Sequence, residues 1–346
     1  MTTGDCVLSG RALVGDDLEI RDVAIEIRAG IIHRVEDTDP CPGTWICPAL
    51  FNAHTHLGDS VAMDTRAEGG LEALVTPPHG LKHRILARTP RDELIRAMQA
   101  SLTFMEAAGT AGCADFREGG EDGVRALQQA ASGIRCRPLI FGREGGEVLA
   151  DGAGISSVRD VQDIEQIITR TRGMGGRIAI HAGERDRFDV DRALCYEPDL
   201  LVHCTHATRR QLIRCADEEI PIAVCARSNW MLGVTSTGKR PPISDMLDLG
   251  CEVLLGTDNC MVVQPDLWQE MAFVATVYGI APLQVFRAAA AGSRIAGRPY
   301  SITEGNPANL ILIDPRASNL WLSHDLARTL VTRTSPLNIV TKVINS

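Results

Sequence analysis

Short segments near both ends of the chain have a strand-like pattern, and in residues 22–28 hydrophobic and polar positions alternate with a period of two. Segments of this kind occur at 22–28, 31–35, 309–314 and 339–345. The first two are separated by Ala29-Gly30, so the pattern predicts a β-hairpin rather than a helix. Because strand-like segments occur at both ends and a different pattern separates them, we expect residues 1–47 and 300–346 to form one small β domain assembled from both termini.

The middle of the chain, residues 48–299, repeats a short apolar run that ends in polar residues and is followed by an amphipathic stretch. The apolar runs predict strands at 45–51, 112–116, 137–141, 177–181, 200–203, 222–225 and 252–256. The amphipathic stretches predict helices at 91–108, 122–132, 161–172 and 208–218. Apolar strands that alternate with helices are typical of a parallel sheet or barrel. With 346 residues, the chain has room for a (β/α)8 barrel of about 250 residues beside the β domain.

Composition and charge restrict the classes of partner. The net charge is −9 and no Lys/Arg run is present, so we expect no nucleic-acid partner. No apolar run approaches the roughly 18 residues that span a bilayer, so we expect no membrane partner. The eleven cysteines show no CxxC spacing, which favours free thiols and a cytoplasmic location. A homodimer is our prior expectation for the assembly.

Several polar residues stand at the ends of predicted strands. His54 and His56 follow one apolar strand, and His181, His203 and Asp258 follow three others. A His-x-His pair alone is equally consistent with a structural role. In a strand, however, residues i and i+2 face the same way, and the carboxyl ends of barrel strands meet at one mouth. Imidazoles with a carboxylate suit a borderline divalent ion, so we predict a zinc site, with iron or manganese as alternatives.

These residues resemble those of the amidohydrolase superfamily of metal-dependent hydrolases. The resemblance covers nearly the whole chain and includes Pro-Ala-Leu-Phe-Asn-Ala-His-Thr-His at 48–56, His181, His203, Asp258 and the closing segment 302–314. It implies a distorted (β/α)8 TIM barrel with a small β-sandwich domain built from both termini. It also implies that His54, His56, His181 and Asp258 bind the metal.

The number of metal ions depends on strand four of the barrel. Superfamily members with two ions bridge them by a carboxylated lysine at the end of this strand. We identify strand four with 137–141, which runs into Gly-Arg-Glu-Gly-Gly without a lysine. None of Lys82, Lys239 and Lys342 lies near that position in the sequence. We therefore expect one divalent ion per chain, with Glu144 as an alternative bridge.

Glu184 indicates the reaction. The string His181-Ala-Gly-Glu184 resembles the HxxE element of adenosine, cytosine and guanine deaminases and of their S-adenosylhomocysteine- and chlorotriazine-acting relatives. In such a site Asp258 accepts a proton from the attacking water and Glu184 protonates a ring nitrogen. His203 holds the attacking hydroxide or stabilises the oxyanion. A surface position is the alternative for Glu184.

Candidate substrate-binding residues are less specific. Segment 224–233 resembles the CPxSN segment of aminohydrolases, with Ala226 in place of the proline, and it suggests Asn229 and Trp230 as pocket residues. We also name Arg117 and His206, although a packed role suits Trp230 equally well. The long loop 59–89 is expected to form a lid or a substrate loop. Further arginines at strand ends suggest an anionic substrate group or, equally, ion pairs with Glu118 and Glu144: Arg143, Arg185 and Arg227.

The leading hypothesis is therefore hydrolytic deamination of a small aminated heterocycle, such as a purine or pyrimidine. Hydrolysis of a cyclic amide or another non-peptide C–N bond is the alternative, since ring-opening enzymes share the metal ligands. A non-catalytic binding protein on the same barrel ranks third, because neither a ligand residue nor Glu184 is missing.

Overall fold

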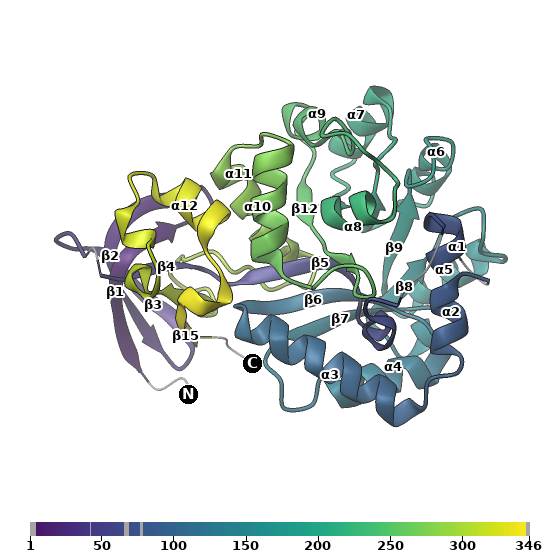
Figure 1. Cartoon of the computed structure of the whole chain (residues 1–346), viewed down its shortest axis with the longest axis horizontal. Helices are drawn as coiled ribbons and strands as arrows, with labels where there is room; N and C mark the ends of the chain where they lie inside the picture. The colour runs from purple at the N-terminus through teal and green to yellow at the C-terminus, as the bar shows by residue number, and fades with distance from the viewer. Residues whose placement is uncertain (1–4, 42, 66–68, 77–78, 344–346) are drawn as a thin grey trace.

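The computed structural model describes residues 5–41, 43–65, 69–76 and 79–343. Strands from both termini form one mixed sheet in the order β15-β14-β4-β1-β2-β3 (Figure 1). Its strands are β1 (Cys6–Val14), β2 (Glu19–Arg28), β3 (Ile31–Asp37), β4 (Trp45–Pro48), β14 (Leu310–Ile313) and β15 (Ile339–Val343). The expected pairing of strands from the two ends of the chain is confirmed, and all six strands are connected in one mixed sheet. Positions 344 and 345 of the predicted last strand lie outside the described residues.

The second sheet contains nine parallel strands in the order β12-β11-β10-β9-β8-β7-β6-β5-β13. They are β5 (Leu50–His56), β6 (Thr110–Arg117), β7 (Arg137–Gly142), β8 (Gly152–Ile155), β9 (Arg177–Ala182), β10 (Leu200–His203), β11 (Ile222–Val224), β12 (Val253–Leu255) and β13 (Asp258–Asn259). Gly256 and Thr257 separate the last two strands. Before them β12 pairs with β11, and after them β13 pairs with β5, so this segment connects the two ends of the sheet. This is the distorted (β/α)8 barrel that we expected.

Two strand assignments need correction. The run 45–51 is not one strand, because the chain passes at Ala49 from β4 in the terminal sheet to β5 in the barrel. Strand four is β8, and 137–141 belongs to strand three. We missed β8 because Gly-Ala-Gly-Ile contains no long apolar run. Its glycines are required by close packing: a Cβ on Gly152 would lie 2.1 Å from the carbonyl oxygen of Arg177, and one on Gly154 would lie 2.7 Å from Phe116.

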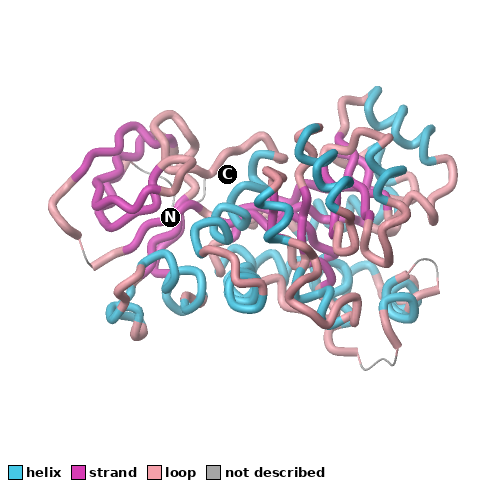
Figure 2. The backbone as a smooth tube through the Cα atoms, turned by 90° about the horizontal axis from the view of Figure 1, so that it is seen from above, coloured by secondary structure: helices cyan, strands magenta, loops and turns pink. Residues whose placement is uncertain are grey.

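Helices surround the barrel strands (Figure 2). The four predicted helices are present as α3 (Arg91–Ala107), α4 (Gly120–Ala130), α5 (Ile164–Gly173) and α7 (Arg209–Asp217). The others are α1 (Leu71–Val75), α2 (Leu81–Leu86), α6 (Val190–Leu194), α8 (Ala226–Met231), α9 (Ile243–Asp248), α10 (Leu267–Val277), α11 (Pro282–Ala291) and α12 (Leu326–Arg333). Thr208 begins α7 with a capping box, in which its side chain accepts from the backbone of Gln211. In the described part of the chain, every helix is too short or too polar to cross a bilayer.

Candidate metal centre and active site

Four of the predicted residues meet at the carboxyl ends of the barrel strands. His54 and His56 end β5, His181 lies in β9, and Asp258 begins β13, where it is paired with Thr55 of β5. All four are buried. His54 Nε2 lies 3.2 Å from His181 Nε2 and 3.1 Å from Asp258 Oδ1, and His56 Nε2 lies 3.6 Å from the same carboxylate oxygen.

The spacing of these atoms fits a divalent metal ion. Two nitrogen ligands at about 2.0–2.1 Å from a tetrahedral zinc ion lie roughly 3.3 Å apart, close to the 3.2 Å between the Nε2 atoms of His54 and His181. Burial lowers the pKa of His54 to about 4 and that of His181 well below its usual value, so both imidazoles are neutral as metal ligands must be. Burial alone would raise the pKa of Asp258, but His54 and its other histidine neighbours hold it well below the ordinary range.

Hydrogen-bond partners fix the orientation of the candidate ligands. His181 Nδ1 donates to the carbonyl oxygen of Ile155 at 3.0 Å, which turns Nε2 toward the centre. His56 Nδ1 lies 3.0 Å from Glu118 Oε1, and Ser228 Oγ donates to Asp258 Oδ2 at 2.6 Å. Such partners set the tautomer and direction of metal ligands. Sequence reasoning missed the roles of Ser228 and Glu118, although Ser228 stands in the segment that it singled out.

The two catalytic candidates beside Asp258 are also adjacent in space. Glu184 Oε1 lies 3.5 Å from His203 Nε2, and one ligand atom of each of Glu184, His203 and Asp258 lies within 4.8 Å of the others. Burial raises the pKa of Glu184, which favours its protonated form. His203 and Asp258 have φ angles of +75° and +63°, a conformation that costs non-glycine residues energy and that clusters at functional sites.

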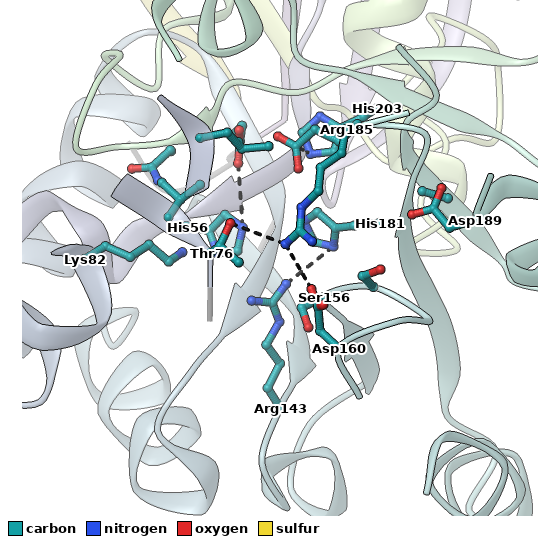
Figure 3. Close-up of a pocket in the computed structure, with 17 residues that line it drawn as sticks. His56, Thr76, Lys82, Arg143, Ser156, Asp160, His181, Arg185, Asp189 and His203 are labelled. Carbon is teal, nitrogen blue, oxygen red and sulfur yellow. Dashed lines mark hydrogen bonds and ion pairs between the residues drawn. The ribbon is translucent and has the colours of Figure 1, made fainter. Parts of the chain in front are cut away.

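A pocket with a volume of about 60 Å³ lies over these residues (Figure 3). The residues that line it include His56, His181, Glu184, His203 and Asp258. Further lining residues come from the segment 71–82 and from the ends of β7, β8 and β9, among them Lys82, Arg143, Ser156 and Arg185. The Arg185 guanidinium hydrogen-bonds Thr76 and pairs with Asp160 at the pocket opening.

The four weaker substrate-binding candidates do not line this pocket. Asn229 is buried and donates to Thr205 Oγ1 at 2.8 Å, and the Trp230 indole donates to Tyr278. Arg117 is 1% exposed and pairs with Asp115 and Glu118, so it takes part in a buried ion-pair network instead of facing the mouth. His206 is partly exposed outside the lining. The observed contacts of Asn229, Trp230 and Arg117 are therefore packing and ion-pair contacts within the protein.

One lysine lies close to the site in space, although not at the end of strand four. Lys82 lies in α2, within the predicted loop 59–89, and its side chain is 3% exposed. Its Nζ lies 3.0 Å from both Asp59 Oδ2 and Glu118 Oε1. It does not occupy the end of strand four, because β8 continues into Ser156 and Ser157. The described parts of this loop form α1 and α2, and Leu71, Val75 and Thr76 line the pocket; positions 66–68 and 77–78 lie outside the described residues.

Comparison with known proteins identifies the family. The model named "Amidohydrolase family" matches residues 165–346. A protein of Methanothermobacter thermautotrophicus, provisionally named an aminohydrolase, is 33% identical over 98% of this chain and 97% of its own length. The chain belongs to the amidohydrolase family. A more distant relative of this amidohydrolase, named 5-methylthioadenosine/S-adenosylhomocysteine deaminase, from Moorella thermoacetica, is 25% identical over 86% of this chain and 80% of its own.

Solved structures share the fold of the amidohydrolase. An adenosine deaminase from Xanthomonas campestris with bound zinc is 15% identical, with a TM-score of 0.78 over 98% of this chain and 91% of that one. An atrazine chlorohydrolase from Arthrobacter aurescens, complexed with zinc, is 18% identical, with a TM-score of 0.80 over 97% and 93%. At this identity the likeness establishes the fold.

Gly256 is predicted to be essential for the position of His54. A Cβ at Gly256 would lie 2.7 Å from His54 Cβ and 2.8 Å from its backbone nitrogen, so Gly256→Ala must displace the end of β5. Overpacking of this kind costs about 1–3 kcal/mol. We expect a lower Tm and reduced metal content by elemental analysis. Gly173→Ala is the control, because a Cβ there meets nothing within 4 Å; equal metal content in both variants would contradict this prediction.

Proposed function

We propose that this amidohydrolase removes ammonia from an aminated heterocycle by metal-dependent hydrolysis. One observation carries the proposal: Glu184, whose pKa is raised by burial, lies beside His203 and Asp258 at the edge of the histidine cluster. A carboxyl group with a raised pKa, next to a site that can activate water, is suited to protonating a ring nitrogen and a leaving amine. The deaminase names among the relatives support the same reaction class.

In this proposal His54, His56, His181 and Asp258 hold one divalent ion, and zinc is favoured because imidazole ligands suit it. Zinc, when bound, supplies a water molecule whose pKa is lowered toward about 7. Ser228 and the Ile155 carbonyl keep Asp258 and His181 aimed at the ion through the hydrogen bonds described above. The zinc in the two solved structures of this fold supports the choice of metal.

The remaining steps belong to side chains of this chain. Asp258 accepts the proton of the attacking water, and its low pKa keeps it ionised for that purpose. Glu184 donates a proton to the ring nitrogen next to the attacked carbon and then assists departure of the amine. His203, close to both carboxyl groups, holds the attacking oxygen and stabilises the negative charge that develops on it.

A single metal ion per chain is the expected stoichiometry. The correct strand four ends at Ile155 and is followed by Ser156 and Ser157, so the lysine that bridges two ions is missing there. Glu144 cannot serve as the bridge from its present position, because its Oε2 accepts from the backbone of Gly119 at the end of strand two. Elemental analysis of the purified protein is expected to give about one equivalent, and a reproducible value of two would overturn this assignment.

Ammonia release tests the proposed reaction. The zinc-loaded protein is incubated with aminated rings, including adenine, guanine, cytosine, adenosine and 5-methylthioadenosine, and in parallel with cyclic amides. Ammonia from at least one ring, and its loss after treatment with a chelator, is the expected result. Carboxylate production from a cyclic amide, with no ammonia from any ring, would replace deamination by ring opening.

A further inference from the structure

Two cationic side chains line the pocket beside His56 and His181 (Figure 3). Lys82 comes from α2 and Arg143 from the turn that follows β7, and their side chains are 3% and 9% exposed. Glu118 Oε1 lies 3.0 Å from Lys82 Nζ and 3.1 Å from Arg143 Nη1, so both cations share one oxygen atom. Two buried positive groups therefore lie side by side at the wall of the metal centre.

Arg143 keeps a hydrogen-bond donor for which the described residues offer no acceptor. Its Nε donates to the carbonyl oxygen of Gly154 and its Nη1 to Glu118. Its Nη2 lies 3.4 Å from His181 Nδ1. That nitrogen already donates to the Ile155 carbonyl, which can only accept, so it carries the proton and cannot accept from Arg143. Among the described residues, no other acceptor is recorded for Nη2.

Lys82 also has one N–H donor without a recorded acceptor among the described residues. An ammonium group has three N–H donors, and Asp59 Oδ2 and Glu118 Oε1 accept two of them. Its pKa is raised, because the charges of Asp59 and Glu118 outweigh the effect of burial, so the group stays charged. The residue lines the pocket, and the described residues offer the third N–H no recorded acceptor.

Contacts within the protein restrict the position of the Arg143 guanidinium group. Its Cζ lies 5.5 Å from the centroid of the Phe116 ring, which itself packs edge-on against His54 and His181. Together with this cation–π contact, the hydrogen bonds to Gly154 and Glu118 restrict the orientation of the guanidinium group. A preorganised donor loses little conformational entropy when it binds.

We propose that Arg143 Nη2 and Lys82 Nζ bind a carboxylate of the substrate, one oxygen each, next to the metal centre. The inference rests on the proposed function, and it narrows the substrate to an aminated heterocycle that bears a carboxylate. Asp59 and Glu118 already compensate the two positive charges, so the argument rests on the spare N–H of each group, for which a charged acceptor forms the stronger hydrogen bond. A carboxylate offers two oxygen atoms, one for each of these donors, and the phosphate arm of the test below separates it from a phosphate group.

Binding of simple probes tests the subsite without turnover. Isothermal titration of the metal-loaded protein compares benzoate, benzamide and inorganic phosphate. We expect benzoate to bind about 10- to 100-fold more tightly than benzamide, the range for a charge-assisted hydrogen bond. Arg143→Gln should remove this preference. Arg159→Gln is the matched control and should retain it, because Arg159 pairs with Asp186 and does not line the pocket. Circular dichroism checks that both variants are folded.

Each other result of the titration overturns the proposal. Equal binding of benzoate and benzamide, or no binding of benzoate, removes the subsite. Benzoate affinity that survives in Arg143→Gln removes Arg143 from the subsite and leaves Lys82 or the metal to bind the carboxylate. Phosphate that binds more tightly than benzoate replaces the carboxylate by a phosphate group.

Turnover separates failure of this inference from failure of the proposed function. For the pair cytosine and 5-carboxycytosine, we expect kcat/KM for ammonia release to favour the carboxylated ring about 10- to 100-fold, and Arg143→Gln to abolish the difference. Ammonia release without any preference would leave deamination standing and remove the carboxylate subsite. A preference for benzoate without ammonia from any ring would leave the carboxylate subsite standing and remove deamination.

Discussion

Asp258→Asn is expected to abolish turnover while leaving the fold intact. Asparagine has nearly the same shape, so its side-chain oxygen can still lie near His54 Nε2 and its amide can donate to Ser228 Oγ. It can neither accept a proton from the attacking water nor contribute a negative charge to the metal. Loss of the base alone costs about 10²–10⁴ in rate, and loss of a metal ligand adds to it. Ammonia release, metal content and Tm measure the three effects separately.

A matched substitution shows whether the effect belongs to the position. Asp186→Asn changes the same residue type, but Asp186 pairs with Arg159 and does not line the pocket. We expect its kcat/KM to stay within about twofold of the parent enzyme, as for surface changes away from such a site. Normal turnover in Asp258→Asn would remove Asp258 from the mechanism, whatever the control shows.

The clustering of the candidate metal ligands could be predicted because barrel geometry brings strand ends together. His54, His181, His203 and Asp258 are far apart in the sequence, but each follows or ends a short apolar strand. The carboxyl ends of parallel barrel strands share one mouth, so these side chains had to approach one another. The period of two in β5 likewise predicted that His54 and His56 face the same side.

The alternation of side chains along β6 could have excluded Arg117 as a substrate-binding residue. Phe116 packs at 4.5 Å from the His54 ring, so it faces the barrel interior. Its neighbour Arg117 therefore faces the opposite side of β6, with Asp115. Thr55, between the two metal-facing histidines, also donates to Asp115. A consistent reading of the strand would have assigned Arg117 to a buried ion pair.

Lys82 and Ser228 could not be placed from sequence, for a different reason. Lys82 lies in the long segment after β5, and only tertiary packing against Asp59 and Glu118 decides that its side chain enters the site. Ser228 lies in α8, a six-residue helix whose start we did not predict. Within that helix Ser228 faces Asp258, whereas Asn229 faces Thr205. Adjacent residues of a helix point in different directions, so the predicted Asn229 lies away from the candidate metal ligands and its neighbour Ser228 contacts one of them.

Glu184→Gln is expected to reduce kcat by about 10²–10⁴ without changing the metal content. Glutamine keeps the length of the side chain but cannot deliver a proton to a ring nitrogen. Burial keeps the pKa of Glu184 raised, so the parent carboxyl group retains its proton to higher pH than an exposed glutamate does. Ammonia release under saturating substrate measures the loss.

Metal content decides between a proton-donating role and a ligand role for Glu184. Its carboxylate lies with His203 and Asp258 in a group close enough to hold an ion, so a fall in bound metal would make it a ligand. Glu147→Gln is the control, because Glu147 is a buried glutamate that pairs with Arg170 and does not line the pocket, and its kcat should be unchanged. Unchanged kcat in Glu184→Gln would end the deaminase mechanism, since no other described side chain of the pocket combines a raised carboxyl pKa with a position beside His203.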